Sequence, residues 1–175
     1  VTGVQTCALP ISDWGRRLKT LQETDPEGYK HSVTLHEGKG HWMNLEDRVA
    51  VPWMSAFTRQ SWPAKVVWVQ DDVVHQRFYW LQVDPQAAKA GDQVTAEVQA
   101  GKIRISVCSK ADLTLLLNDR LLSLDSPISV EFPDGSTQSF TVQRKLAVMA
   151  TGLLERNDPV GVPTASITLA VPVRQ

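Results

Sequence analysis

The spacing of apolar residues divides the chain into a first third of helical character and a longer remainder of strand character. Near the start, Trp14, Leu18 and Leu21 recur at i, i+4 and i+7, which is one face of a 3.6-residue period. This spacing predicts a helix over 13–24. The turn-forming residues at 25–28 are expected to end it.

A strand and a second helix follow in the pattern. Residues 29–35 alternate with a period of two and predict a short strand, which leads into a glycine-bearing loop at 37–41. Apolar residues then return at helical spacing over 45–58, with Asn44 as a candidate cap and Pro52 expected to restart the helix. The order helix, strand, loop, helix is typical of α/β proteins.

From about residue 61 the chain changes to short β-type runs separated by turn residues, which predicts an antiparallel β-sandwich or a small barrel. Residues 133–136 (PDGS) suit a hairpin turn, and helical spacing over 145–155 predicts one helix beside the sheets. The boundary between the two regions is expected near 59–65. The predicted strands are 65–70, 77–83, 92–98, 102–107, 112–117, 128–132, 138–143 and 166–171.

Composition narrows the class of protein. Among 175 residues, 18 Lys and Arg stand against 19 Asp and Glu, for a net charge of −1, and 42% of residues are hydrophobic. A balanced charge without runs of one sign gives no electrostatic basis for a nucleic-acid partner, and no apolar stretch predicts a membrane span. We expect a folded domain with no disulfide scaffold and no cofactor.

Residues 1–11 (VTGVQTCALPI) have neither helical nor strand periodicity and lack the features of a signal peptide. They resemble the in-frame translation of a short-read sequencing adaptor, a contaminant of metagenomic assemblies. We therefore expect 1–11 to be non-native, with Cys108 as the only native cysteine. On that expectation the true N-terminus lies upstream, so the sequence gives no localisation.

His41 is the strongest candidate for chemistry. It follows a predicted strand, in a loop where Gly38 and Gly40 allow the backbone to turn sharply. An imidazole held there can act as a general base, because its ordinary pKa near 6.5 lets it take a proton at neutral pH. The alternative interpretation is a surface or packed histidine without a catalytic role.

A series of short motifs in a fixed order carries a resemblance to a known family. The motifs are LHEGKGHWM at 35–43, VPWM at 51–54, FTR at 57–59, VVW at 66–68, QDD at 70–72 and RFYWL at 77–81. With these motifs the chain resembles the C-terminal part of α/β-hydrolase serine esterases, similar to polyhydroxybutyrate depolymerases and dienelactone hydrolases. The resemblance extends from about residue 13 to the end and is strongest at 35–80.

The resemblance implies an α/β-hydrolase C-terminal remnant at 12–60, followed by an antiparallel β-sandwich domain with one helix at 61–175. In that family a nucleophilic serine, an acid and a histidine follow one another along the chain, and His41 matches the histidine. No Gly-x-Ser-x-Gly motif occurs in this sequence. Serine and acid would therefore lie upstream, and we expect this chain to be inactive alone.

Other candidates have plainer explanations. His31, His36 and His41 with Glu37 match no zinc-ligand spacing, so we expect no metal site. A polar loop between two predicted strands contains Asp71, Asp72 and His75. The alternative interpretation of these three residues is a cation site. Cys108 is expected to be a buried small hydrophobe without reactivity.

The aromatic residues Trp68, Phe78, Tyr79 and Trp80 suit either a stacking surface or the core. If 77–83 is one strand, Phe78 and Trp80 share a face and Tyr79 takes the other, so that at least half of the set is core. The two functional hypotheses are then a fragment of an enzyme acting on small or polymeric esters and an autonomous β-sandwich that binds a ligand or partner. The sequence does not indicate an oligomeric state.

Overall fold

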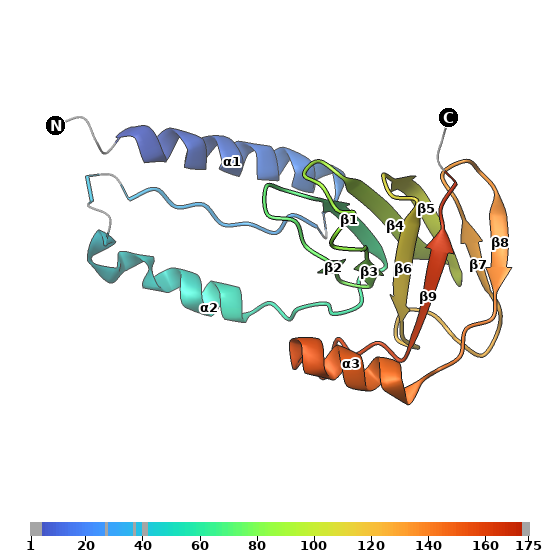
Figure 1. Ribbon diagram of the computed structural model, residues 1–175. Coiled ribbons are helices and arrows are strands. Elements are labelled where there is room, and N and C mark those ends of the chain that lie inside the picture. Colours follow the sequence, from blue (N-terminus) through green and yellow to red (C-terminus); the bar gives the residue numbers. More distant parts are fainter. Residues whose placement is uncertain (1–4, 27, 37, 40–41, 173–175) are drawn as a thin grey trace. The chain divides into compact units, whose positions relative to one another are not determined.

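The computed structural model describes residues 5–26, 28–36, 38–39 and 42–172 (Figure 1). His41, Glu37 and Gly40 lie outside the described residues. The chain divides into two compact units, Val1–Thr58 and Arg59–Gln175. None of the described helices combines the length and the apolar character needed to cross a membrane.

The first unit contains helices in the order that the hydrophobic spacing predicts. Helix α1 (Gln5–Thr24) includes the predicted helix 13–24 and begins earlier, within the segment 1–11 that shows no helical periodicity. The 3₁₀-helix η1 (Met43–Val49) passes directly into α2 (Ala50–Ser55). Pro52 lies in the first turn of α2, where a missing N–H breaks no helical hydrogen bond.

The predicted strand at 29–35 is not a strand in the structure. The segment runs extended beside α1 (Figure 1), where Val33 lies so close to Gly15 that a Cβ on the glycine would stand 3.2 Å from Val33 Cγ2. A strand forms only where a neighbouring strand pairs with its N–H and C=O groups. The described part of this unit offers no such neighbour, so the alternating pattern stays unpaired.

No side chain described between residues 11 and 58 is buried. Large apolar side chains are exposed instead, among them Trp42 at 78%, Leu45 at 70% and Met54 at 56%. A folded domain normally encloses such side chains in its interior. This segment therefore presents its apolar face outward in the structure.

The second unit consists of two sheets and one helix. The first sheet has the strand order β1 (Lys65–Val69), β4 (Gln93–Gln99), β5 (Lys102–Cys108), β7 (Ile128–Glu131) and β8 (Thr137–Phe140). The second has the order β2 (Arg77–Phe78), β3 (Leu81–Gln82), β6 (Asp112–Leu117) and β9 (Ala165–Ala170). Helix α3 (Leu146–Arg156) precedes β9.

The five-stranded sheet is mixed, which differs from the fully antiparallel arrangement expected. Strands β5 and β7 run parallel, with Ile103 opposite Val130. Between them the chain crosses to the other sheet to form β6 and then returns. A crossover of this kind is what a parallel pair requires, and the spacing of strands along the sequence does not reveal it.

The predicted strand 77–83 is interrupted by a tight turn. Tyr79 has φ 52°, and Phe78 pairs with Leu81, so β2 and β3 form a hairpin around Tyr79 and Trp80. A positive φ at the first loop residue is typical of the tightest hairpins. Consequently Phe78 and Trp80 do not share a face: Phe78 is 39% exposed, whereas Trp80 is fully buried.

The inward faces of both sheets meet in one hydrophobic core. The alternating burial along β1 and β5 and the continuous burial at the end of β6 show which face points inward. Trp80 is the largest side chain that is fully enclosed, and its Nε1 donates a hydrogen bond to the Pro63 carbonyl at 2.8 Å. The Arg59–Gln175 unit is therefore a β-rich domain with a core of its own.

The segment that leads into β1 is fastened to this domain. Arg59 donates two hydrogen bonds to the Asp158 carboxylate, both at 2.9 Å, and Trp62 Nε1 donates to the Val160 carbonyl at 3.0 Å. Asp158 also accepts hydrogen bonds from the amides of Val160 and Gly161. The Arg59 hydrogen bond, together with these amides, lowers the pKa of Asp158 to about 2 although burial opposes the shift.

This pKa predicts acid lability of the segment. Because the folded pKa lies below the ordinary value of about 3.9, the carboxylate stabilises the fold above about pH 4 and loses that contribution as pH falls toward about 2. We expect Asp158→Asn to lower stability in urea unfolding at pH 7, and the difference from the parent protein to shrink as pH falls from about 4 toward about 2. Glu97→Gln, on the outward face of β4, is the control and should show no such convergence. A constant difference between Asp158→Asn and the parent protein at both pH values would contradict the assignment.

Candidate functional site

Glu46 contacts two described residues that precede His41 in the sequence. Its carboxylate accepts a hydrogen bond from Lys39 Nζ at 2.7 Å, and its other oxygen lies 3.4 Å from His36 Nδ1. His36 and Lys39 come before residues 40–41, which are not among the described residues, and Glu46 comes after them. The Glu46 carboxylate thus links the chain before residue 40 to the chain after residue 41 through charge-assisted contacts. The sequence pattern did not indicate this role.

The backbone just after His41 adopts an uncommon conformation. Met43, Asn44 and Leu45 all have positive φ, at 44°, 51° and 62°. Asparagine tolerates this region, but methionine and leucine occupy it at a cost of order 1–3 kcal/mol each, which is a frequent feature of functional loops. Asn44 therefore lies inside η1 and does not cap a helix, contrary to the sequence prediction.

Two of the histidines considered as metal ligands, His31 and His36, are among the described residues and contact different partners. His31 Nδ1 lies 2.8 Å from the Tyr29 carbonyl, and His36 faces Glu46. Among the residues that the structure describes, no group of three or more His, Cys, Asp or Glu side chains is placed to hold a metal ion.

The loop containing Asp71, Asp72 and His75 is organised by Gln70. Its buried side chain donates to the His75 carbonyl at 2.7 Å and accepts from the His75 amide at 2.9 Å. The two aspartates accept hydrogen bonds from the next amide in the chain, Asp72 and Val73 respectively. These contacts close a polar turn, which agrees with the plainer of the two interpretations.

Cys108 and the aromatic set belong mainly to the core. The Cys108 thiol is half-buried, donates toward the Lys110 carbonyl at 3.4 Å, and has a raised pKa because burial disfavours the thiolate. Trp68 and Trp80 are buried and Tyr79 packs against the core. Phe78 alone of the four aromatics is exposed, and its ring stacks on Trp68 with centroids 6.0 Å apart.

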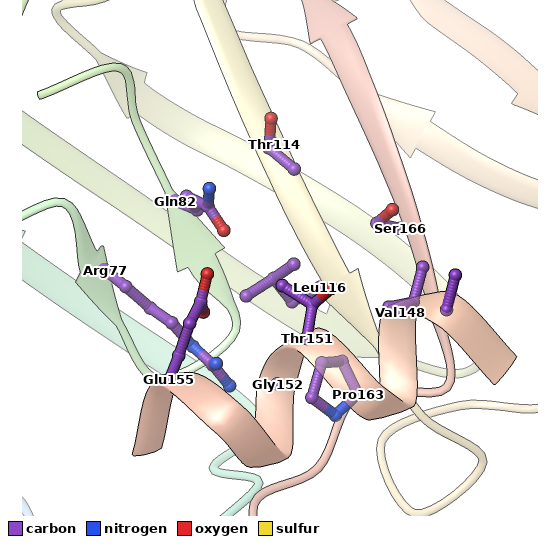
Figure 2. A pocket seen from close by; sticks show the side chains of 11 residues that line it. Arg77, Gln82, Thr114, Leu116, Val148, Thr151, Gly152, Glu155, Pro163 and Ser166 are labelled. Carbon is purple, nitrogen blue, oxygen red and sulfur yellow. The ribbon is translucent and has the colours of Figure 1, made fainter. Parts of the chain in front are cut away.

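A groove of about 270 Å³ lies between α3 and the outward face of the four-stranded sheet (Figure 2). Local sequence pattern does not reveal this groove, because it joins residues from four strands and a helix that are far apart along the chain. The strands contribute Arg77, Gln82, Thr114, Leu116 and Ser166. The helix contributes Ala147, Val148, Thr151, Gly152 and Glu155, and Pro163 closes one side.

Gly152 explains how the helix approaches the sheet. It is the buried residue of α3, and a Cβ added there would stand 2.7 Å from Pro163 Cδ. The helix therefore rests on Pro163 at its glycine, and the side chains on either side of Gly152, including Val148 and Glu155, form the wall of the groove.

Arg77 supplies the groove's positive charge. Its guanidinium donates to the Tyr79 carbonyl at 3.0 Å and the Gly161 carbonyl at 3.2 Å, while Nη1 is buried without a partner in the described part. Burial lowers the pKa of Arg77, the neighbouring Arg156 adds to this effect, and Glu155 opposes it. The groove thus combines one cationic and one anionic side chain with neutral polar groups.

Comparison of this chain with protein-family models, curated proteins and solved structures finds no match.

Proposed function

We propose that this chain is the C-terminal part of a serine hydrolase acting on carboxylic esters, in which His41 is the general base. The proposal rests on the ordered motifs between residues 35 and 81 and on the position of His41 in a glycine-bearing loop. The nucleophilic serine and the acid would come from outside this sequence, which contains no Gly-x-Ser-x-Gly motif.

The observation that carries the proposal is the outward apolar face of the first unit. Between residues 11 and 58 the structure describes no buried side chain, and Trp42, Leu45, Val49 and Met54 are each more than half exposed. Exposed apolar side chains that cluster in one segment are typical of surfaces that contact another protein, a membrane or a ligand. The missing cover, on this proposal, is the rest of a hydrolase domain.

The loop around His41 also supports the proposal. The Glu46 carboxylate contacts Lys39 and His36, which precede His41 in the sequence. The three consecutive residues 43–45, which follow His41, all have positive φ. A catalytic imidazole needs a backbone that fixes its position, because misplacement costs orders of magnitude in rate. On this proposal, the contacts of Glu46 and the backbone of 43–45 would contribute to fixing that position.

The chemistry would be acyl transfer to a serine. His41 would remove the proton from the serine hydroxyl as the oxygen attacks the ester carbonyl, and would then return it to the departing alkoxide. An acid beside the imidazole would orient it and stabilise its charged form. Neither the described residues nor the motifs assign that acid within this chain.

The proposal predicts that the isolated chain hydrolyses p-nitrophenyl acetate no faster than buffer containing a matched concentration of imidazole. Without a nucleophile elbow, His41 has no hydroxyl to activate. The measurement is release of p-nitrophenolate by the chain and by His41→Ala. Turnover by the chain that disappears in His41→Ala would contradict the claim that the catalytic parts are divided.

A further inference from the structure

We propose that the groove between α3 and the outward face of the four-stranded sheet binds a neutral polyhydroxylated ligand, the size of a single sugar ring. This inference is independent of the ester hydrolase proposal, because every residue of the groove belongs to the Arg59–Gln175 unit.

The groove contains polar side chains that make no hydrogen bond within the described part of the chain. Gln82, Thr151, Glu155 and Ser166 all line it, and Figure 2 shows Glu155 reaching from α3 toward Gln82 on β3. By contrast, the Thr114 hydroxyl is already bonded to Thr168 at 2.8 Å. Four side chains therefore offer donors and acceptors to a molecule in the groove.

The charges of the groove favour a neutral ligand. Arg77 on β2 and Glu155 on α3 both line the groove, and the two charges influence each other. A ligand anion attracted by the guanidinium is therefore repelled by the carboxylate, and a ligand cation attracted by the carboxylate is repelled by the guanidinium. Hydroxyl groups avoid this conflict because each can donate to Glu155 and accept from Gln82.

The volume of the groove and its apolar lining suit a ligand with one sugar ring. The volume of about 270 Å³ lies just below the roughly 300–1,000 Å³ typical of small-molecule sites. Leu116, which is buried, and Val148 provide apolar surface on which the C–H groups of a sugar ring can rest. A longer oligosaccharide would extend beyond these contacts.

The test is titration of the full, ¹⁵N-labelled chain with methyl glucoside, N-acetylglucosamine and glycerol, followed by amide NMR. We expect saturable shifts from a ring-sized sugar at millimolar concentration, confined to amides around Gln82, Thr151, Glu155 and Ser166. Glu155→Gln should weaken binding about tenfold or more, since it replaces a charged acceptor. Ser166→Phe should abolish binding by filling the groove from an exposed position on β9.

Glu97→Gln is the matched control, because it removes a carboxylate from the outward face of the other sheet and should leave binding unchanged. Thermal unfolding of each variant verifies that the fold is kept. The proposal is overturned if no neutral sugar gives saturable shifts in the groove, or if Ser166→Phe binds as the parent does. Tighter binding of glucosamine or glucuronate than of the neutral sugars would overturn the inference of a neutral ligand.

Discussion

Replacing Trp80 by alanine is expected to lower the free energy of unfolding of the Arg59–Gln175 unit by about 3–5 kcal/mol. Trp80 is fully buried in the core that both sheets share, so its removal leaves a cavity that the surrounding strands cannot close. It also takes away the 2.8 Å hydrogen bond from Nε1 to the Pro63 carbonyl, just ahead of β1. The measurement is urea unfolding followed by far-ultraviolet circular dichroism.

Two further variants separate the causes of this loss. Trp80→Phe keeps most of the apolar volume and loses the hydrogen bond, so its stability should fall between those of the parent and the alanine variant. Leu154→Ala truncates an apolar side chain of α3 that is 88% exposed, and should change stability by no more than about 0.5 kcal/mol. Equal losses in Trp80→Ala and Leu154→Ala would contradict the assignment of Trp80 to the core.

Much of the β-rich unit could be predicted from local sequence pattern. The alternation over 65–70 and 102–107 corresponds to β1 and β5, and the helical spacing over 145–155 corresponds to α3. The turn at 133–136 joins β7 to β8 as an antiparallel pair, with Gly135 at φ 86°. These features depend on neighbouring residues, which is why the pattern reports them.

Features that depend on distant residues could not be predicted in this way. The parallel pairing of β5 with β7 requires a crossover through the other sheet, and the turn at Tyr79 occurs without glycine, asparagine or proline to mark it. The alternating residues 29–35 form no strand because pairing needs a partner that the described part of the unit lacks. In each case tertiary structure decides between conformations that the local pattern leaves equivalent.

The candidate sites show the same limit. His41 could be singled out from its loop and the adjoining motifs, yet Glu46, which bonds Lys39 across that loop, gave no signal. The groove under α3 joins residues as far apart as Arg77 and Ser166, and Gly152 reveals its role only through the close approach of Pro163. A single sequence carries chemistry-bearing residue types, whereas their grouping into a site is a property of the fold.

The hydrolase proposal is tested most directly by ester hydrolysis with the protein encoded by the complete gene. The gene is recovered from the source DNA, and its product is assayed on p-nitrophenyl acetate as the parent protein, as His41→Ala and as His31→Ala. His31 is the matched control because it is a histidine of the same unit, with its Nδ1 at the Tyr29 carbonyl. Circular dichroism verifies that all three proteins are folded.

We expect the parent protein and His31→Ala to turn over the ester at similar rates and His41→Ala to lose about 10³-fold or more in kcat, as removal of a triad base does. We also expect the recovered gene to encode a Gly-x-Ser-x-Gly motif ahead of the region that corresponds to residue 13. Activity that is unchanged in His41→Ala, or an intact gene without a nucleophile elbow, would contradict the account and leave the β-rich unit as a binding domain.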